Sequence, residues 1–333
     1  MKLSIDIGNG YVKAINEEGK MLHFPTVIKE NIDSNILKSK NDYEMQIDGI
    51  NYYIGDLAII KRATRRWENS KTFHQDTKIY IALCSSLLSE TTESEIPENK
   101  IEIELCLGLP YSYYITLNRG KNIIDELSGI QLETEYHGKK KSIHISKISV
   151  FPQGIGAYFS NLYDITGTPY SGAEEYLKSI FIDIGYRTVD VVSFEVLNNT
   201  FELIEENSFS LEEYGIFNAI NNISKTASKE FEITPNDVEF AIQHKNSIFE
   251  NMYGEIDLSP ISKKEYANLA DKIVNSINLK LSSDINKYRH LFLTGGGAVK
   301  LYDFIKERYP NLILQKDYIF CNAKGYLALE NTK

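Results

Sequence analysis

Alternating apolar and polar positions dominate the first part of the chain. In residues 2–16 they alternate twice, in KLSIDI and in YVKAIN, with a glycine-containing turn between the two stretches. A period of two residues is typical of strands that bury one face. We therefore expect a strand, a turn and a second strand here, continued by a third strand in MLHFPTVI. Residues 43–60 predict another hairpin around Asp48-Gly49, which is a common turn dipeptide.

Helical spacing of apolar residues alternates with these strands along the rest of the chain. The clearest helix is predicted over residues 262–281, and its expected buried face consists of Tyr266, Leu269, Ile273, Ile277 and Leu281. Further helices are predicted over 75–89, near 118–127, from Gly215 onward, and after an N-cap at Thr234 or Asn236. Further strands are predicted over 101–110, 179–206 and 291–294. Strands that alternate with helices are typical of the α/β class.

The composition restricts the possible partners. The chain has 333 residues, 42% hydrophobic content and a formal net charge of −10. DNA binding without sequence preference relies on Lys and Arg to neutralise phosphates. We therefore expect no direct nucleic-acid binding, and we interpret the basic runs at 61–66 and 139–141 as solvated faces.

The expected location is the cytoplasm, without membrane contact. No apolar run reaches the ~18 residues of a membrane span, and the chain enters a strand pattern at once, without a signal peptide. The cysteines, Cys84, Cys106 and Cys321, are few and widely spaced, which predicts reduced thiols. The six histidines show no ligand spacing, so we expect no transition-metal site.

The turn after the first strand, Asp6-Ile-Gly-Asn-Gly, has the glycine spacing of a phosphate-binding loop. A dinucleotide-binding loop or a P-loop requires a helix directly after the glycines, whereas a strand pattern continues here through Lys13. We therefore predict a hairpin tip in which Gly8 and Gly10 adopt positive φ and direct N–H groups at an anion. Asn9 and Lys13 would add donors. Asp6 would tolerate phosphate if Mg²⁺ lay between the two.

The same arrangement recurs in the second half of the chain. Asp183-Ile-Gly-Tyr-Arg-Thr follows an apolar run, and Gly185 is expected to turn the chain into a second strand. One such turn is commonly an ordinary Asx turn. Two of them, one in each half, predict that Asp6 and Asp183 share one Mg²⁺ across a phosphate tail.

Two further elements add to this pattern. The strand LFLT runs into Gly295-Gly296-Gly297, and a helix follows. Glycines at this point allow the backbone to lie flat against a bulky group such as adenosine. Gln153 ends a strand in VFPQGIGA, where its side chain would orient a water for in-line attack on a γ-phosphate.

These elements, in this order, resemble the actin-like ATPase superfamily, which also includes sugar kinases and heat-shock chaperones. The resemblance is closest to the ParM-like plasmid-segregation actins of bacteria. They share a start of the form Asp-x-Gly-Asn-Gly-x-x-Lys, a GLP strand end, a PQGxGA-like stretch and a terminal NAKGY-like segment. The shared motifs extend from residue 6 to residue 326, while residues 30–75 and 225–262 carry none.

The resemblance implies an actin-like ATPase fold, with two related α/β domains around a nucleotide cleft. The first domain would comprise residues 1–165 with the C-terminal helix 323–333 and the first phosphate loop. The second would comprise residues 166–322 with the second phosphate loop and the adenosine loop.

The resemblance also implies roles for individual residues. Asp6 and Asp183 would hold Mg²⁺ through water, and Gln153 would position the hydrolytic water. The residues implied to contact ATP or ADP are Gly8, Asn9, Gly10, Lys13, Gly185, Tyr186, Arg187, Thr188, Glu212, Glu213, Gly215, Gly295, Gly296 and Gly297. Tyr186 and Arg187 depart from the family, which often has small residues there. Arg187 therefore keeps three alternatives: a phosphate contact, a filament contact, or plain exposure.

The function implied is that of a Mg²⁺-dependent ATP hydrolase that polymerises head to tail with nucleotide, with GTP and GDP as alternative nucleotides. Its filament would segregate plasmid DNA through a separate DNA-binding adaptor. One alternative is a small-molecule kinase of the same superfamily, which would need a catalytic carboxylate where this chain has Gln153. The other is a nucleotide-gated chaperone or scaffold. We expect no room for a chaperone's peptide-binding region after the triple glycine.

Overall fold

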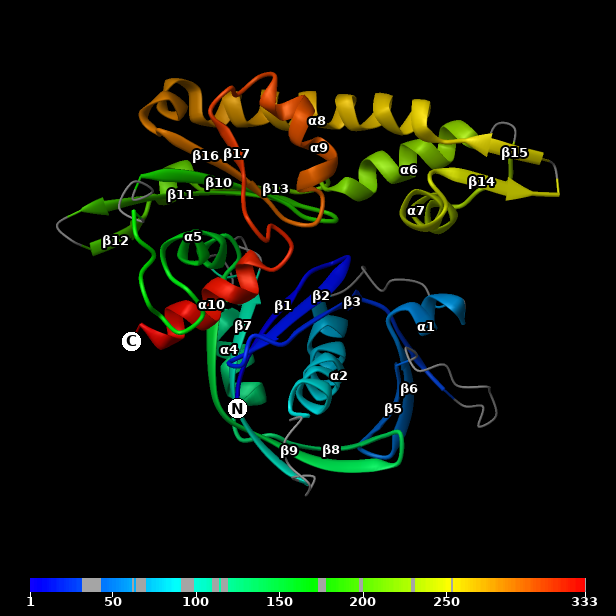
Figure 1. The fold of residues 1–333 in the computed structure, drawn as a ribbon, viewed down its shortest axis with the longest axis vertical. Helices are drawn as coiled ribbons and strands as arrows, with labels where there is room; N and C mark the ends of the chain where they lie inside the picture. The colour runs from blue at the N-terminus through cyan, green and yellow to red at the C-terminus, as the bar shows by residue number, and fades with distance from the viewer. Residues whose placement is uncertain are drawn as a thin grey trace. The chain divides into compact units, whose positions relative to one another are not determined.

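The computed structural model describes the chain except residues 32–42, 62, 64–69, 91–98, 110–113, 115–118, 173–177, 198–199, 229–230, 253 and 333. The basic run at 61–66 and Pro110 of the GLP motif therefore lie mostly or wholly outside the described residues. The chain divides into two compact units (Figure 1). Unit 1 consists of residues 1–174 and 319–333, and unit 2 of residues 175–318. The boundaries expected from the sequence lie close to these breaks.

Unit 1 is built on a nine-stranded sheet with the order β3-β2-β1-β7-β9-β8-β5-β6-β4. The strands are β1 (Lys2–Ile7), β2 (Tyr11–Asn16), β3 (Met21–Pro25), β4 (Ile28–Glu30), β5 (Tyr43–Ile47), β6 (Ile50–Ile54), β7 (Lys100–Leu109), β8 (Gln131–Tyr136) and β9 (Lys139–Pro152). The central strand β1 pairs antiparallel with β2 and parallel with β7. The hairpin predicted over residues 43–60 is confirmed around Asp48-Gly49 as the β5–β6 turn, but the prediction was wrong for residues 56–60, which form a short helix.

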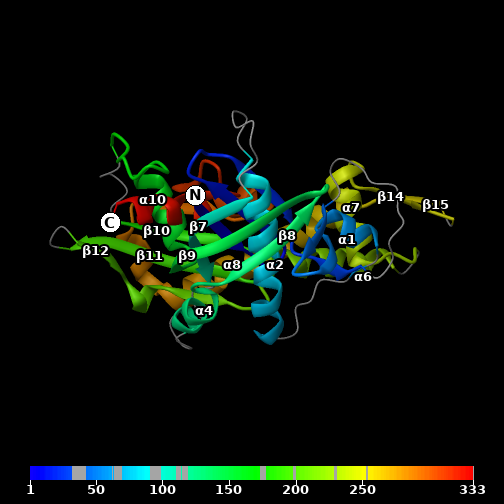
Figure 2. The same ribbon diagram turned by 90° about the horizontal axis from the view of Figure 1, so that it is seen from below.

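Helices cover both faces of the central strands of unit 1. They are α1 (Asp56–Ile60), α2 (Ser70–Leu88), α4 (Arg119–Leu127), α5 (Ile155–Leu162) and α10 (Cys321–Asn331). Alternate residues of a strand point to opposite faces, and Leu3 and Ile5 of β1 belong to the large core with α2. Ser4, between them, donates to the carbonyl of Ala323 in α10 at 2.6 Å. Figures 1 and 2 show α2 within the curve of the sheet.

Three of the motifs shared with ParM-like actins meet in one packing contact between α5, α10 and β7. A methyl group added at Gly325 would overlap the backbone carbonyl of Gly156. One added at Gly108 would overlap the ring of Tyr326, which is fully buried. The glycines therefore permit a close approach of backbone that any larger residue would prevent.

Unit 2 is built on a six-stranded sheet with the order β12-β11-β10-β16-β17, in which β13 also pairs with β11. The strands are β10 (Ser179–Ile184), β11 (Val189–Leu197), β12 (Thr200–Leu203), β13 (Phe209–Leu211), β16 (His290–Thr294) and β17 (Leu312–Leu314). Strand β10 pairs antiparallel with β11 and parallel with β16. These are the same two relations that β1 has to β2 and β7, so the repeated sequence pattern corresponds to a repeated strand arrangement.

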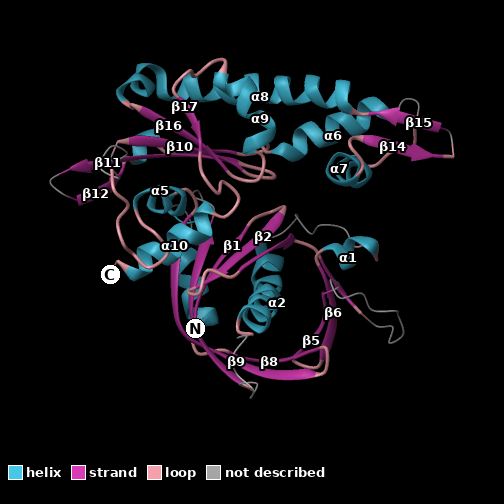
Figure 3. Cartoon of the chain, in the orientation of Figure 1, coloured by secondary structure: helices cyan, strands magenta, loops and turns pink. Residues whose placement is uncertain are grey.

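The helices of unit 2 are α6 (Ile216–Ala227), α7 (Pro235–His244), α8 (Ser259–Leu281) and α9 (Ala298–Lys306), with 3-10 turns at Glu205–Asn207 and Ser282–Lys287. All five residues of the predicted face of α8 are buried. Thr234 is confirmed as the N-cap of α7, where it forms a capping box with Asp237. A separate hairpin of β14 (Ile248–Asn251) and β15 (Gly254–Asp257) lies beside α7 (Figure 3).

Two expectations from composition can be compared with the fold. The three cysteines are buried and form no disulfide. In the part of the chain that the structure describes, no helix combines the length and the apolar character needed to cross a bilayer.

Candidate functional site

The first candidate turn joins two strands, as predicted, rather than a strand and a helix. Strands β1 and β2 pair in a register that places Asp6 opposite Lys13. The N–H of Gly8 donates to the carbonyl of Tyr11 at 3.1 Å and closes the turn. The hydroxyl of Thr26 donates to the carbonyl of Gly8 at 2.7 Å, which anchors the tip to the segment after β3.

The reason given above for two of the glycines was wrong. Neither Gly8 nor Gly10 adopts a positive φ, and neither does Gly185 in the second turn. A Cβ at Gly8 would lie 3.0 Å from the ammonium of Lys13 and 3.1 Å from the carbonyl oxygen of Tyr11. The space beside the glycine at position 8 is therefore tight, and its backbone is not left-handed.

A buried polar cluster lies directly beneath this turn. The amide of Gln153 donates to Oδ1 of Asp6 at 2.8 Å, and the ammonium of Lys13 lies 3.1 Å from Oδ2. The side chains of Asp6 and Lys13 are only 4% and 12% exposed. A buried carboxylate is stable when it is paired and hydrogen-bonded, and here both of its oxygens have a partner. The structure thus brings three of the predicted residues together in unit 1.

Gln153 is held in place by the end of β9 and the start of α5. Its backbone N–H donates to the carbonyl of Leu109 at 2.6 Å. The side chain of Asn322 accepts hydrogen bonds from the N–H groups of Gly154 and Ala157, both at 3.1 Å, and so caps the first turn of α5. Asn322 belongs to the terminal NAKGY motif, which was noted in the sequence without a role.

The second candidate turn has the same backbone plan but different side chains. Asp183 lies opposite Asp190 of β11, in the position that Lys13 has relative to Asp6. Asp190 is 3% exposed and accepts hydrogen bonds from the hydroxyl groups of Ser210 and Thr188. Two carboxylates that face each other across a strand pair repel unless a cation or donors compensate them. The sequence placed Asp190 on the strand after the turn but did not count it among the site residues, although its place in DIGYRTVD gives it the cross-strand position.

Helix α6 begins directly against this turn. The N–H groups of Gly215, Ile216 and Phe217 donate to the carbonyls of Arg187, Gly185 and Tyr186, at 2.8, 3.1 and 2.9 Å respectively. A methyl group at Gly215 would overlap the carbonyl of Tyr186. The backbone N–H groups at the start of α6 thus hold the second turn in place.

The side chain of Tyr186 is directed into unit 2. Its ring is 8% exposed and stacks on Phe217, and its hydroxyl donates to Oε2 of Glu239 at 2.9 Å. Because the phenol group of Tyr186 already bonds to Glu239, the predicted contact with nucleotide now concerns only its backbone. The three alternatives for Arg187 stay open.

The triple glycine packs against the strand that carries Asp183. Gly295 has φ of +88°, and a methyl group there would overlap the Asp183 carboxylate. The N–H of Gly297 donates to the carbonyl of Ile184 at 2.9 Å. A Cβ at Gly296 would meet no atom within 4 Å, and this residue is exposed. Two of the three glycines are thus needed for contact within the protein, and Gly296 is the one with open space beside it.

Unit 2 contains a hollow of about 350 Å³ between α6, α8 and the loop before α6. Glu212 and Glu213 line it, but Gly215 and the triple glycine are not among its lining residues. Its other polar side chains include Asn218, Asn222, Glu265, Asn268 and Lys272. This lining offers both donors and acceptors next to the loop that leads into α6.

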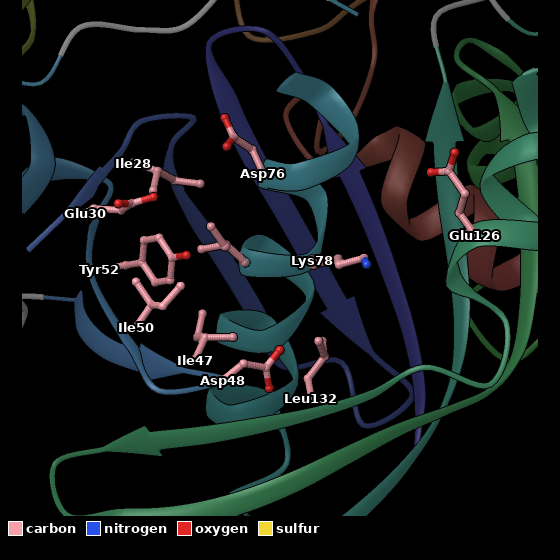
Figure 4. A pocket seen from close by; sticks show the side chains of 11 residues that line it. Ile28, Glu30, Ile47, Asp48, Ile50, Tyr52, Asp76, Lys78, Glu126 and Leu132 are labelled. Carbon is pink, nitrogen blue, oxygen red and sulfur yellow. The ribbon is translucent and has the colours of Figure 1, made fainter. Parts of the chain in front are cut away.

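A second hollow, of about 450 Å³, lies in unit 1 between α2 and strands β4 to β6 (Figure 4). Its charged lining residues are Glu30, Asp48, Asp76, Glu126 and Lys78. Four carboxylates against one ammonium would repel a triphosphate. None of the predicted site residues lines this hollow, so we do not assign nucleotide to it.

The carboxylates at the two turns suit Mg²⁺ better than a metal ion bound by protein ligands alone. Among the described residues, no three His, Cys, Asp or Glu side chains are grouped as a metal site would require. Mg²⁺ keeps several waters and is usually bound through one or two carboxylates together with substrate phosphates. Asp6 and Asp183, each buried at the end of a strand beside a turn, fit that mode of binding.

Comparisons with known families assign both units. A family described as actin-like proteins, N-terminal domain, matches residues 4–156. A family described as archaeal actin homologue MreB-like, C-terminal, matches residues 181–307. The chain is an actin-like protein. The fold class predicted from the sequence, an actin-like fold with two α/β domains, is confirmed.

Curated relatives of this actin-like protein include archaeal actin homologs. The homolog of Thermoplasma acidophilum is 29% identical over 197 residues, and that of Thermoplasma volcanium is 28% identical over 195 residues. Each match covers 57% of this chain and 56% of the relative. The match thus spans little more than half the length of these relatives.

Solved structures share the fold over the whole chain. A non-polymerisable quadruple mutant of pCBH ParM has a TM-score of 0.82 at 23% identity, and the match covers 100% of this chain and 99% of that one. A 15-stranded ParM filament from Clostridium botulinum gives 0.81 at 23% identity with the same coverage. An archaeal actin homolog in complex with ADP gives 0.78 at 20% identity, again with the same coverage. The predicted likeness to ParM-like actins is confirmed.

Proposed function

We propose that this actin-like protein is a Mg²⁺-dependent ATPase whose bound nucleotide controls head-to-tail polymerisation. The observation that carries the proposal is the pair of acid-ended hairpin turns. Asp6 and Asp183 occupy equivalent strand positions in the two units, and each is followed by a turn closed through a glycine N–H. A phosphate chain bound by both turns would join the two units through one Mg²⁺.

The residues of unit 1 would act on the phosphate end. Lys13 would neutralise charge on the phosphates, as it neutralises Asp6 in the structure. The amide nitrogen of Gln153 faces Asp6, so its oxygen is the atom that would accept a hydrogen bond from the attacking water. Mg²⁺, when bound, would stabilise the negative charge that develops on the transferred phosphoryl group.

The residues of unit 2 would bind the remainder of the nucleotide. Asp183 would hold Mg²⁺ through water, and the backbone of the turn from Gly185 to Thr188 would contact phosphate. Gly296 would leave space for the nucleoside. The hollow beside Glu212 offers hydrogen-bond partners for ribose or base.

Polymerisation would follow from a head-to-tail contact between copies of the chain. A head-to-tail contact joins two different surfaces, so it does not close and produces a filament. The solved ParM filament supports this proposal by likeness of fold. The filament would segregate plasmid DNA in the cytoplasm through a separate DNA-binding adaptor. The net charge of −10 agrees with the need for an adaptor, since an acidic chain is ill-suited to direct contact with DNA.

The test combines light scattering, electron microscopy and phosphate release after addition of ATP, GTP or ADP with Mg²⁺. We expect filaments with ATP and release of phosphate without any acceptor substrate, both abolished by EDTA. Gln153→Ala should slow phosphate release and lengthen the life of the filaments. Exposed Gln131, replaced by Ala, provides the control. Absence of polymers over a broad concentration range would overturn the proposal. Turnover that required a small-molecule acceptor would instead indicate a kinase.

A further inference from the structure

A buried carboxylate in unit 2 has no part in the function proposed above. Glu239 of α7 is 7% exposed. It accepts the hydrogen bond of the Tyr186 hydroxyl at Oε2, 2.9 Å away, and Oε1 lies 3.3 Å from the amide nitrogen of Gln243. Because a buried charge is costly unless it is satisfied, the position of Glu239 requires these neighbours.

The charge of Glu239 also reaches two other helices. Lys300 of α9 is largely buried; burial lowers the pKa of its ammonium, and the charge of Glu239 acts in the opposite direction. Burial, with a smaller contribution from Glu239, raises the pKa of Tyr266 in α8 to about 12. The Lys300 ammonium lies 5.8 Å from the centre of the Tyr266 ring. Glu239 thus forms hydrogen bonds with the second turn and within α7, and its charge affects the pKa of one group on α8 and one on α9.

Two of these groups lie in or next to the segments that we propose bind nucleotide. Tyr186 lies within the turn that follows Asp183. Lys300 lies in the first helical turn after Gly297 of the triple glycine. The two turns also touch each other, since Gly295 packs on Asp183. Through Tyr186, Glu239 thus links the second turn to α7, and α7 contacts the β14–β15 hairpin.

Packing alone does not explain a charged side chain here. Buried ion pairs contribute little net stability, and apolar residues of similar volume often replace them without loss. The ring of Tyr186 would stack on Phe217 without its hydroxyl. The directed bond to Glu239 instead fixes where the turn lies relative to α7.

We propose that Glu239 is a positioning residue, which through its hydrogen bond with Tyr186 holds the second phosphate turn against α7 and relays nucleotide binding to α7 and the β14–β15 hairpin. This inference rests on the proposed function, because it requires nucleotide at these turns. The expected effect of nucleotide is a change in mobility. When nucleotide occupies the turns, α7 and the β14–β15 hairpin become less mobile.

The test is hydrogen–deuterium exchange of the full chain with and without Mg-ADP, together with calorimetric titration of Mg-ADP. In the unaltered protein we expect slower exchange both in the peptide that contains residues 183–188 and in the peptides over 235–257. Tyr186→Phe removes only the hydroxyl. We expect Mg-ADP binding to weaken by at most about tenfold, because the lost bond lies within the protein and its free energy, on the scale of one hydrogen bond to a charged group, limits the change in affinity. The slowing at 183–188 should remain, and the slowing over 235–257 should be lost.

Matched variants separate this relay from general loss of structure. Tyr309→Phe removes another buried phenol bond of unit 2, to Asn278 at 2.8 Å, and should behave like the unaltered protein. Glu239→Gln keeps an oxygen for the phenol and should retain the slowing over 235–257, whereas Glu239→Leu should lose it. Circular dichroism verifies that each variant is folded.

The outcomes also distinguish the two proposals. No slowing at 183–188 in the unaltered protein would overturn both the proposed function and this inference. Slowing at 183–188 without slowing over 235–257, or the same pattern in Tyr186→Phe as in the unaltered protein, would overturn the inference alone.

Discussion

At the scale of residues, the two acid-ended turns were predictable because strand alternation and glycine spacing are local. Asp6, Lys13 and Gln153 could be named from the sequence, and the structure brings them together. The pairing of Asp183 with Asp190 was missed, because it depends on cross-strand register and not on a motif. The conformation of Gly8 was misjudged, since a glycine in a tight space looks the same in a sequence as one required by positive φ.

The buried pair in unit 1 gives a prediction that needs no nucleotide. Lys13→Met leaves the Asp6 carboxylate buried without its ammonium, so the free energy of unfolding should fall by about 3 kcal/mol. Adding Asp6→Asn should recover part of the loss, because the neutral amide needs no counter-charge. Urea denaturation measures both. Lys139→Met breaks an exposed pair with Glu90 and should change stability by less than about 1 kcal/mol. A loss as small in Lys13→Met would contradict the account.

At the scale of elements, long periodic segments were predictable, and short strands with distant partners were not. Helix α8 and the strands that carry the turns follow the predicted pattern. Strand β8, which pairs with β9, and the β14–β15 hairpin were not assigned. Strand β8 has one aliphatic residue in six, and β14 and β15 have four residues each, so their stability as strands depends on contacts that a local pattern does not contain.

The contact between α5 and α10 gives a prediction for elements. Gly325→Ala would force a methyl group into the backbone of Gly156, which cannot move aside as a flexible side chain would. We expect a loss of about 3 kcal/mol in the free energy of unfolding. Gly120→Ala is the matched helical control: its Cβ would lie 3.4 Å from the nearest atom, and it should be neutral or stabilising by up to about 1 kcal/mol. Equal effects of the two substitutions in thermal or urea unfolding would count against the contact.

At the scale of the whole molecule, the sequence pattern repeats once per unit, and so does the arrangement of an antiparallel and a parallel neighbour around the acid-bearing strand. The side chains do not repeat: unit 1 sets Lys13 opposite its aspartate, and unit 2 sets Asp190 there. In the proposed function this asymmetry assigns charge neutralisation to unit 1 and favours metal binding in unit 2. The general fold could be predicted because the motifs cover both units. The division of tasks could not, because it depends on opposing strands.

The most direct test of a shared Mg²⁺ is a double-mutant cycle on ATP affinity, measured by calorimetry with and without Mg²⁺. Asp6→Asn and Asp183→Asn should each weaken Mg-ATP binding by roughly tenfold or more, and the double variant should be little weaker than either single one, since residues that act on one ion are not additive. Without Mg²⁺ the weakening should disappear or reverse, because a carboxylate without the ion repels phosphate. Single effects that simply add, or weakening that persists without Mg²⁺, would contradict the account.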